Sequence, residues 1–220
     1  MTQDEANVMV LFILFGLIWS AVRNAINEYS SKSHNPVRSP ASPVGHQNQT
    51  VAEPRTDNGR GPSNGIGGIA ADVARDLGLI YRIDPTFDAG QFLDSGCLVY
   101  EAIVLGFANG DRDLLHDLTS DEVYNAFLEI ILKREQRCER VELKFVCLEN
   151  VEITNVSLFN KRAQITIGFV AQLITATRAE NGAVVAGDPE KILNVNDMWT
   201  FARELTSKRP AWKLVGTDSA

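Results

Sequence analysis

The sequence of 220 residues predicts an α+β domain, in which N-terminal helices pack on one face of a long-stranded antiparallel sheet. Three observations predict this class. Apolar residues recur at helical spacing up to about residue 140, they alternate at the two-residue period of strands from Val141 onward, and the helical part precedes the strand part. An apolar N-terminal stretch and a polar linker come before the domain.

Residues 1–29 contain the most apolar stretch of the chain. The 17 residues between Glu5 and Arg23 carry no charge, and as a helix they would span about 26 Å, near the lower limit for a hydrocarbon core of about 30 Å. A signal peptide requires Lys or Arg before its apolar stretch, and none precedes this one. A retained membrane anchor is therefore favoured. A cleaved export signal and a segment lying in the membrane interface remain alternatives. The predicted membrane-contacting residues are Val8, Leu11, Phe12, Phe15, Ile18, Trp19 and Val22.

Positive charge follows the predicted anchor and does not precede it. Arg23, Lys32 and Arg38 come after the span, which predicts a single-pass protein with its C-terminal domain in the cytoplasm. Residues 30–65 are rich in Ser, Pro, Asn and Gly and almost lack large apolar residues. Such a segment cannot bury enough apolar surface to fold, so we expect a disordered linker.

The net charge of −7 lies entirely in the second part of the chain. Residues 1–83 hold seven acidic and seven basic residues, whereas residues 84–220 hold 21 acidic and 14 basic ones. An acidic domain of this kind argues against nucleic acid as a partner, because phosphate attraction needs clustered Lys and Arg. Cys97, Cys138 and Cys147 have no CxxC spacing, so we expect free thiols in a reducing compartment, with no metal site and no cofactor.

Residues 66–83 predict an amphipathic helix. Its apolar face comprises Ile66, Ile69, Ala70, Val73, Leu77 and Ile80. This face could pack on the domain itself or lie on a membrane or a partner. Ile69, Val73 and Leu77 are therefore candidates for contact with lipid or a partner.

Three further helices open the domain predicted over residues 84–218. Asp88 caps the first, which ends at Asn109-Gly110. Asp111–Thr119 forms a short second helix, and Thr119-Ser-Asp-Glu122 is a capping box for the third. The third helix ends in a basic cluster of Lys133, Arg134, Arg137 and Arg140. Cations at a helix C-terminus are expected from the helix dipole, and contact with an anionic lipid headgroup or acidic partner is the functional alternative.

The remaining residues predict an antiparallel sheet. Arg162–Arg178 alternates most regularly, with Ile165, Ile167 and Phe169 on one face, and Glu180-Asn-Gly182 supplies a hairpin turn. We expect Asp188-Pro189 to interrupt the returning strand. The predicted strands are Val141–Val156 with a kink, Arg162–Arg178, Ile192–Leu205 and Trp212–Val215. A curved sheet covered by helices leaves a cone whose mouth can hold an apolar ligand.

Several motifs of the domain occur together, in order, over residues 84–217. They include Asp84-Pro-Thr-Phe-Asp, Phe107-Ala-Asn-Gly-Asp, Thr119-Ser-Asp-Glu-Val-Tyr-Asn-Ala-Phe, Asp197-Met-Trp-Thr-Phe-Ala-Arg and Trp212-Lys-Leu-Val. This set resembles the Tim44-like domain family, which includes the membrane-docking subunit of the mitochondrial presequence translocase and the bacterial TimA proteins. The resemblance implies a cone-shaped domain of the nuclear-transport-factor-two-like type. It also implies a membrane-tethered adaptor of the bacterial inner membrane that binds secretion or translocation machinery and membrane lipid, with anionic lipid as a candidate.

The wider fold class also includes enzymes that use Asp, His or Tyr inside the cone. Asp197, His116 and Tyr100 are the candidates in this chain, but no nucleophile motif or phosphate-binding loop accompanies them. The ordinary expectation places His116 on an exposed helix, Asp197 at a strand edge and Tyr100 in the core. The sequence thus predicts a protein that is not an enzyme, with a lipid- or small-ligand-binding or catalytic cone as the alternative.

Overall fold

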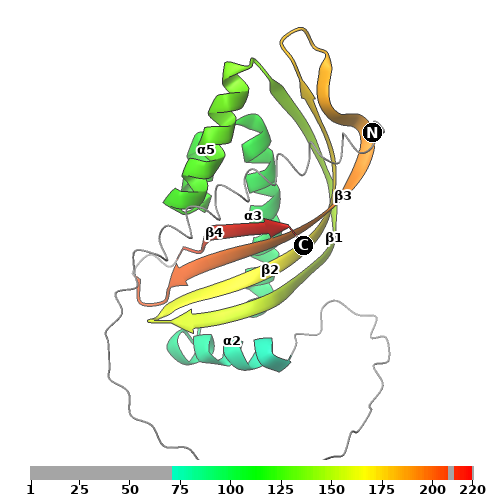
Figure 1. The fold of residues 1–220 in the computed structure, drawn as a ribbon. Helices are drawn as coiled ribbons and strands as arrows, with labels where there is room; N and C mark the ends of the chain where they lie inside the picture. The colour runs from blue at the N-terminus through cyan, green and yellow to red at the C-terminus, as the bar shows by residue number, and fades with distance from the viewer. Residues whose placement is uncertain (1–70, 208–210, 220) are drawn as a thin grey trace, which may run out of the picture.

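The computed structural model describes residues 71–207 and 211–219 (Figure 1). The predicted anchor, the linker and Ile69 lie outside these residues. Within them four helices precede four strands, so the predicted α+β class is confirmed. The elements are α2 (Ala71–Ile83), α3 (Ala89–Asn109), α4 (Arg112–Leu118), α5 (Asp121–Gln136), β1 (Arg140–Phe159), β2 (Arg162–Arg178), β3 (Val184–Glu204) and β4 (Lys213–Ser219).

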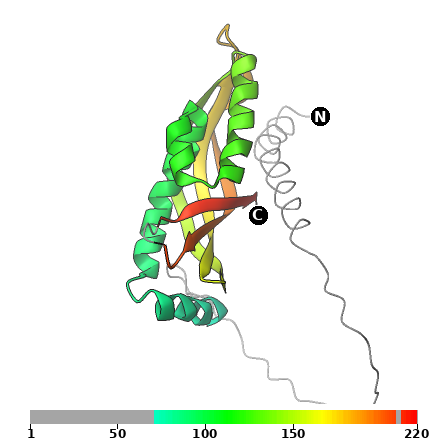
Figure 2. The same ribbon diagram turned by 90° about the vertical axis from the view of Figure 1, so that its left-hand side faces the viewer.

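The four strands form one antiparallel sheet in the order β1-β2-β3-β4. Three register shifts interrupt the pairing of β1 with β2, and shifts of this kind bend a sheet and increase its twist. Figure 1 shows α2 across one end of the curved sheet and the β2–β3 hairpin tip at the other end. Figure 2 shows α3 and α5 running alongside the strands. Helices covering a curved sheet give the cone that the sequence predicted.

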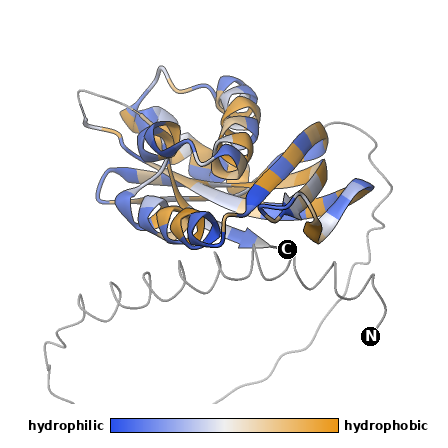
Figure 3. Cartoon of the chain, turned by 90° about the horizontal axis from the view of Figure 1, so that it is seen from above, coloured by the Kyte–Doolittle hydropathy of each residue, from blue (hydrophilic) through white to orange (hydrophobic). Residues whose placement is uncertain are grey.

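The core lies between the helices and the inward face of the sheet. Ile165, Ile167 and Phe169 of β2 are 0–1% exposed, which confirms the alternation expected for this strand. Burial of a large apolar side chain stabilises the fold by roughly 1.5–3 kcal/mol. Figure 3 shows that the helices carry both hydrophobic and hydrophilic residues, as helices packed on one side do.

The predicted ends of α3 are confirmed. The Oδ1 atom of Asp88 accepts a hydrogen bond from the backbone N–H of Gln91 at 2.8 Å. At the other end, Gly110 adopts a left-handed conformation with φ of 72°, which favours glycine.

The capping box predicted for α5 is wrong by one residue. Ser120 caps this helix, and its Oγ accepts from the N–H of Val123 at 3.4 Å. Thr119 is the C-cap of α4, and its hydroxyl donates to the carbonyl of Leu115 at 2.7 Å. Because α4 and α5 follow each other so closely, Thr119 ends the first helix and Ser120 begins the second.

The predicted break at Asp188-Pro189 is also wrong, because β3 continues through it. Pairing with β2 moves from Asp188 opposite Thr175 to Leu193 opposite Leu173. Residues 189–192 therefore form a bulge. Proline has no N–H to donate to a neighbouring strand, and a bulge places it where none is needed.

Candidate functional site

Helix α2 is built into the domain on one side and open on the other. Val73, Leu77 and Ile80 are 6%, 2% and 0% exposed and belong to the main core. The predicted contact residues Val73 and Leu77 thus lie inside the fold. Leu79, Tyr81 and Ile83 are about 40% exposed (40%, 39% and 41%). The sequence reading missed these three residues, and the signal for them was apolar side chains outside the main helical stripe.

A cluster of polar contacts fixes the turn between α2 and α3 to the end of β3. Arg203 of β3 forms an ion pair with Asp84, whose Oδ1 also accepts from the Thr86 hydroxyl at 2.5 Å. The hydrogen bond from Thr86 and, to a smaller extent, the one from Arg203 lower the pKa of Asp84 below its usual value. The Arg203 guanidinium also lies 5.2 Å from the centre of the Trp212 ring. Three of the family-like motifs therefore meet at this point.

The basic residues at the end of α5 do not form one patch of free cations. Lys133 pairs with Glu129 at 2.6 Å, and Arg137 pairs with Glu139 at 2.9 Å. Arg140, the first residue of β1, is exposed.

Arg134, the fourth member of the predicted basic cluster, lies inside the fold. Arg134 is only 7% exposed, and its guanidinium donates a hydrogen bond to the carbonyl of Phe107 at 3.2 Å. The guanidinium carbon also lies 5.7 Å from the centre of the Phe107 ring. Burial lowers the pKa of Arg134, as expected for a cation removed from water. These contacts join α5 to α3.

Two of the three catalytic candidates meet inside the cone. The Tyr100 hydroxyl, on α3, donates a hydrogen bond of 2.7 Å to Oδ2 of Asp197 on β3. Tyr100 is 0% and Asp197 is 2% exposed. The expectation that Asp197 sits at a strand edge is therefore wrong, because Asp197 pairs with Phe169 of β2 and with Ser219 of β4, and its side chain shares the inward face of β3 with Trp199. His116 lies apart, with its ring 5.1 Å from that of Tyr124.

The surroundings of this pair are apolar and aromatic. The ring of Tyr100 lies 4.5 Å from the rings of both Phe169 and Trp199. Burial raises the pKa of Asp197 to about 6, against the smaller opposite effect of the hydrogen bond from Tyr100. Burial and the neighbouring carboxylate also raise the pKa of Tyr100. The pair joins helix to sheet and is closed to solvent, so it does not present a general acid or base to a substrate.

Other features bear on cofactors and on the membrane. Cys97, Cys138 and Cys147 are free, as predicted. In the part of the chain that the structure describes, no group of three or more His, Cys, Asp and Glu side chains is arranged to hold a metal ion. Among the same residues, α3 alone is long and apolar enough to cross a membrane, and it packs on the sheet as a core helix.

The domain is thus an α+β domain in which one buried polar pair, Tyr100 with Asp197, and one part-buried pair, Asp84 with Arg203, fix helices to a curved four-stranded sheet. The family model described as "Tim44-like domain" matches residues 73–219, and the chain belongs to this family. It is 27% identical over 164 residues to the human mitochondrial import inner membrane translocase subunit TIM44, covering 70% of this chain and 35% of that protein. The subunit from Rattus norvegicus is 26% identical over 161 residues, with the same coverage. The chain thus spans about a third of these relatives.

Two solved structures match part of the chain at low similarity. The intermembrane space region of the chloroplast protein ARC6 has a TM-score of 0.41 at 12% identity, covering 61% of this chain and 98% of that one. A protein of the NTF2-like family from Streptomyces avermitilis has a TM-score of 0.31 at 12% identity, covering 60% and 99%.

Proposed function

We propose that this protein is a membrane-tethered adaptor that holds its Tim44-like domain near the inner membrane and binds a component of secretion or translocation machinery there. Family membership and the names of the relatives, which are inner membrane translocase subunits, support this role. The apolar segment within residues 1–29 would anchor the chain, and the linker of residues 30–65 would let the domain search for its partner.

The observation that carries the proposal is the apolar surface that α2 leaves open. Leu79 and Ile83, one turn apart, expose apolar surface on one flank of a helix whose core face is buried, and Tyr81 does so on the opposite flank. The helix carries Asp72, Asp76, Arg75 and Arg82, so its net charge is zero. A neutral apolar surface has no electrostatic attraction to anionic lipid, which favours an apolar segment of a protein partner.

The basic end of α5 is the second proposed contact. Lys133, Arg137 and Arg140 reach solvent and would meet anionic headgroups, whereas Arg134 is held in the fold. The paired carboxylates of Glu129 and Glu139 reduce the local positive charge. This contact is therefore expected to be weaker than the one made by α2.

The closed interior supports an adaptor over a catalytic or ligand-binding cone. Tyr100 and Asp197 satisfy each other and are sealed from water. A substrate would have to separate them and open the aromatic packing around them. Binding at the outer surface requires no such change.

Site-specific photo-crosslinking in the membrane-bound full chain tests the proposal. A p-benzoylphenylalanine residue in place of Leu79 should yield a defined protein adduct. The same probe in place of Leu98, which is 72% exposed on α3, is the control and should not yield that adduct. A probe in place of Arg137 should give lipid adducts. If the Leu79 probe labels only lipid or nothing, α2 is not the partner surface.

The proposed orientation has a separate test in the exposed thiol of Cys138. A membrane-impermeant maleimide should label Cys138 in inverted membrane vesicles and leave it unlabelled in intact spheroplasts. Labelling from the periplasmic side would place the domain on the wrong side of the membrane for this proposal.

A further inference from the structure

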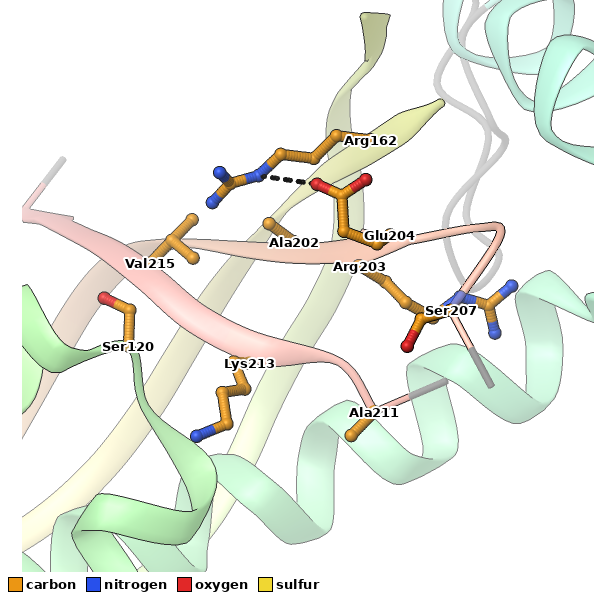
Figure 4. A pocket seen from close by; sticks show the side chains of 9 residues that line it. All are labelled: Ser120, Arg162, Ala202, Arg203, Glu204, Ser207, Ala211, Lys213 and Val215. Atoms are coloured by element: carbon orange, nitrogen blue, oxygen red, sulfur yellow. Dashed lines mark ion pairs between the residues drawn. The ribbon is translucent and has the colours of Figure 1, made fainter. Parts of the chain in front are cut away.

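A cleft of about 290 Å³ lies where β3 ends and β4 returns. Figure 4 shows Arg162 and Glu204 on one side of β4, Lys213 on the other, and Ser120 beside the strand. The cleft is lined by residues of β2, β3, β4 and the cap of α5, and by Ser207 and Ala211 between β3 and β4. It does not include the exposed residues of α2, so it is independent of the proposed partner surface.

Strand register explains why these side chains gather. Arg162 of β2 lies opposite Glu204 of β3, and Lys213 of β4 lies opposite Ala202, two residues before Glu204. Two strand spacings, roughly 10 Å, separate the β2 and β4 backbones. Figure 4 shows Lys213 turned away from Arg162 across β4, where its ammonium contacts the carbonyl of His116, so a shared ligand requires the Lys213 side chain to rotate. Ala202 between them is small and leaves room.

Ser120, the N-cap of α5, lines another side of the cleft. The backbone N–H of Ser120 donates to the carbonyl of Leu214 at 2.8 Å, which holds the Ser120 hydroxyl beside β4. Lys213 in turn donates to the carbonyl of His116 at 3.2 Å. Both contacts fix the wall formed by α4 and α5 against the last strand.

The charge of this cleft is opposite to that of the domain. Arg162, Arg203 and Lys213 stand against one lining carboxylate, Glu204, within residues 84–220 that carry −7 overall. Arg203 is already paired with Asp84. Arg162 approaches Glu204 only to 3.9 Å, with both side chains about half exposed, and such a pair is weak. Among the described residues, Lys213 forms no ion pair.

We infer that this cleft binds a phosphate monoester, with Arg162 and Lys213 as its two cationic contacts and the Ser120 hydroxyl as a third polar contact. A phosphate presents several oxygens to donors that approach from different sides, and charge-assisted hydrogen bonds to Arg and Lys are short and strong. The volume suits a phosphate on a small alcohol or on a lipid headgroup. Glu204 in the cleft, with Asp121 and Glu122 in the first turn of α5, limits the affinity.

Titration of the full-length chain in phosphatidylcholine nanodiscs tests this inference. The probes are inorganic phosphate and glycerol phosphate, added at constant ionic strength so that general screening does not change. We expect saturable shifts of the backbone amide signals of Ser120, Lys213 and Leu214. Replacing Lys213 or Arg162 with Gln should weaken binding about tenfold or more, because each loses a charge-assisted hydrogen bond.

Two further variants separate the cleft from general electrostatics. Glu204→Gln should tighten binding, since it removes the competing carboxylate beside Arg162. Lys144→Gln removes an exposed cation from β1 and should leave the affinity unchanged. Equal weakening in K144Q and K213Q, or no saturation at phosphate concentrations on the order of 20 mM, overturns the inference. Unchanged thermal unfolding of each variant excludes misfolding as the cause of lost binding.

The source of the phosphate is distinguished by adding phosphatidic acid, a lipid phosphate monoester, to the nanodiscs. If phosphatidic acid competes with glycerol phosphate, the ligand is a lipid headgroup at the membrane. If glycerol phosphate binds equally in both kinds of nanodisc, the ligand is a soluble ester. Either result supports phosphate binding, and K213Q should leave the crosslink at position 79 unchanged.

Discussion

Asp84 and Asp197 both connect the helical layer to β3, yet their carboxylates behave in opposite ways. Asp84 precedes α3 and meets Arg203 and Thr86, and its pKa falls. Asp197 lies on β3 and meets the neutral hydroxyl of Tyr100, and its pKa rises to about 6. The difference shows two ways in which the fold holds a carboxylate that is partly or fully removed from water. Hydrogen bonds from Thr86 and Arg203 keep the part-buried Asp84 ionised, whereas burial makes Asp197 gain a proton more easily, against the smaller opposite effect of the hydrogen bond from Tyr100.

Removing the cation of the first pair has the largest expected effect. Arg203→Met keeps an apolar chain against Trp212 but leaves Asp84 without its counter-charge. We expect a loss of about 2 kcal/mol in the free energy of unfolding at pH 7, below the 3–5 kcal/mol typical of a fully buried pair, because the Asp84 side chain is 18% exposed. Urea unfolding followed by circular dichroism measures it.

The matched control for this change is Arg162→Met, on the neighbouring strand. Its ion pair with Glu204 is longer and exposed, so the loss should stay within about 0.5 kcal/mol. The pKa of Asp84 is lowered in the fold, so its stabilising contribution is present above the unfolded value and is lost as pH falls through the folded value. The effect of R203M should therefore shrink in acid. An equal loss in both variants would contradict the contrast between the two pairs.

The second pair should be visible in the pH dependence of stability. The folded pKa of Asp197 is about 6, above its ordinary value of 3.8. A raised folded pKa contributes stability that is fully present below the unfolded value and is lost as pH rises through the folded value. From pH 5 to pH 8 the loss from this group should be about 1–1.5 kcal/mol.

Asp197→Asn isolates this contribution, because an amide does not titrate but still offers an oxygen to Tyr100. A constant loss of stability in the variant does not affect the test, which concerns only the slope of stability against pH. The unfolding free energies of the wild type and D197N should converge between pH 5 and pH 8. Parallel curves would show that Asp197 does not change its protonation in this range.

Much of the fold follows from local pattern, whereas the polar contacts of the interior follow from packing. The Asp88 cap and the alternation of β2 needed only spacing and residue type. Arg134 shares the helical spacing of Phe127 and Ile131, so its burial had a signal, but the general preference of Arg for helix C-termini gave a competing explanation. The pairing of Tyr100 with Asp197 joins residues 97 positions apart and required the tertiary fold.

The phosphate cleft was beyond sequence reasoning for a similar reason. Arg162 and Lys213 lie on strands that do not pair with each other, and only the register through β3 brings them to the same end of the sheet. The acidic composition of residues 84–220 also pointed away from any anion site. Net charge describes a whole domain, and strand register can gather the few cations of an acidic domain at one end of its sheet.

The smallest expected effect tests whether Thr86 contributes to the charged state of Asp84. Thr86→Val removes the hydroxyl that donates to Asp84 at 2.5 Å and keeps the shape of the side chain. The backbone N–H of Thr86 still donates to the same oxygen at 3.1 Å, and Arg203 remains, so we expect a loss of only about 0.5–1 kcal/mol at pH 7. Because the hydroxyl stabilises the ionised carboxylate, the loss should fall towards zero once Asp84 is protonated. A loss that stays constant from neutral pH into acid would mean that Thr86 acts through packing, and Arg203 alone would then keep Asp84 ionised.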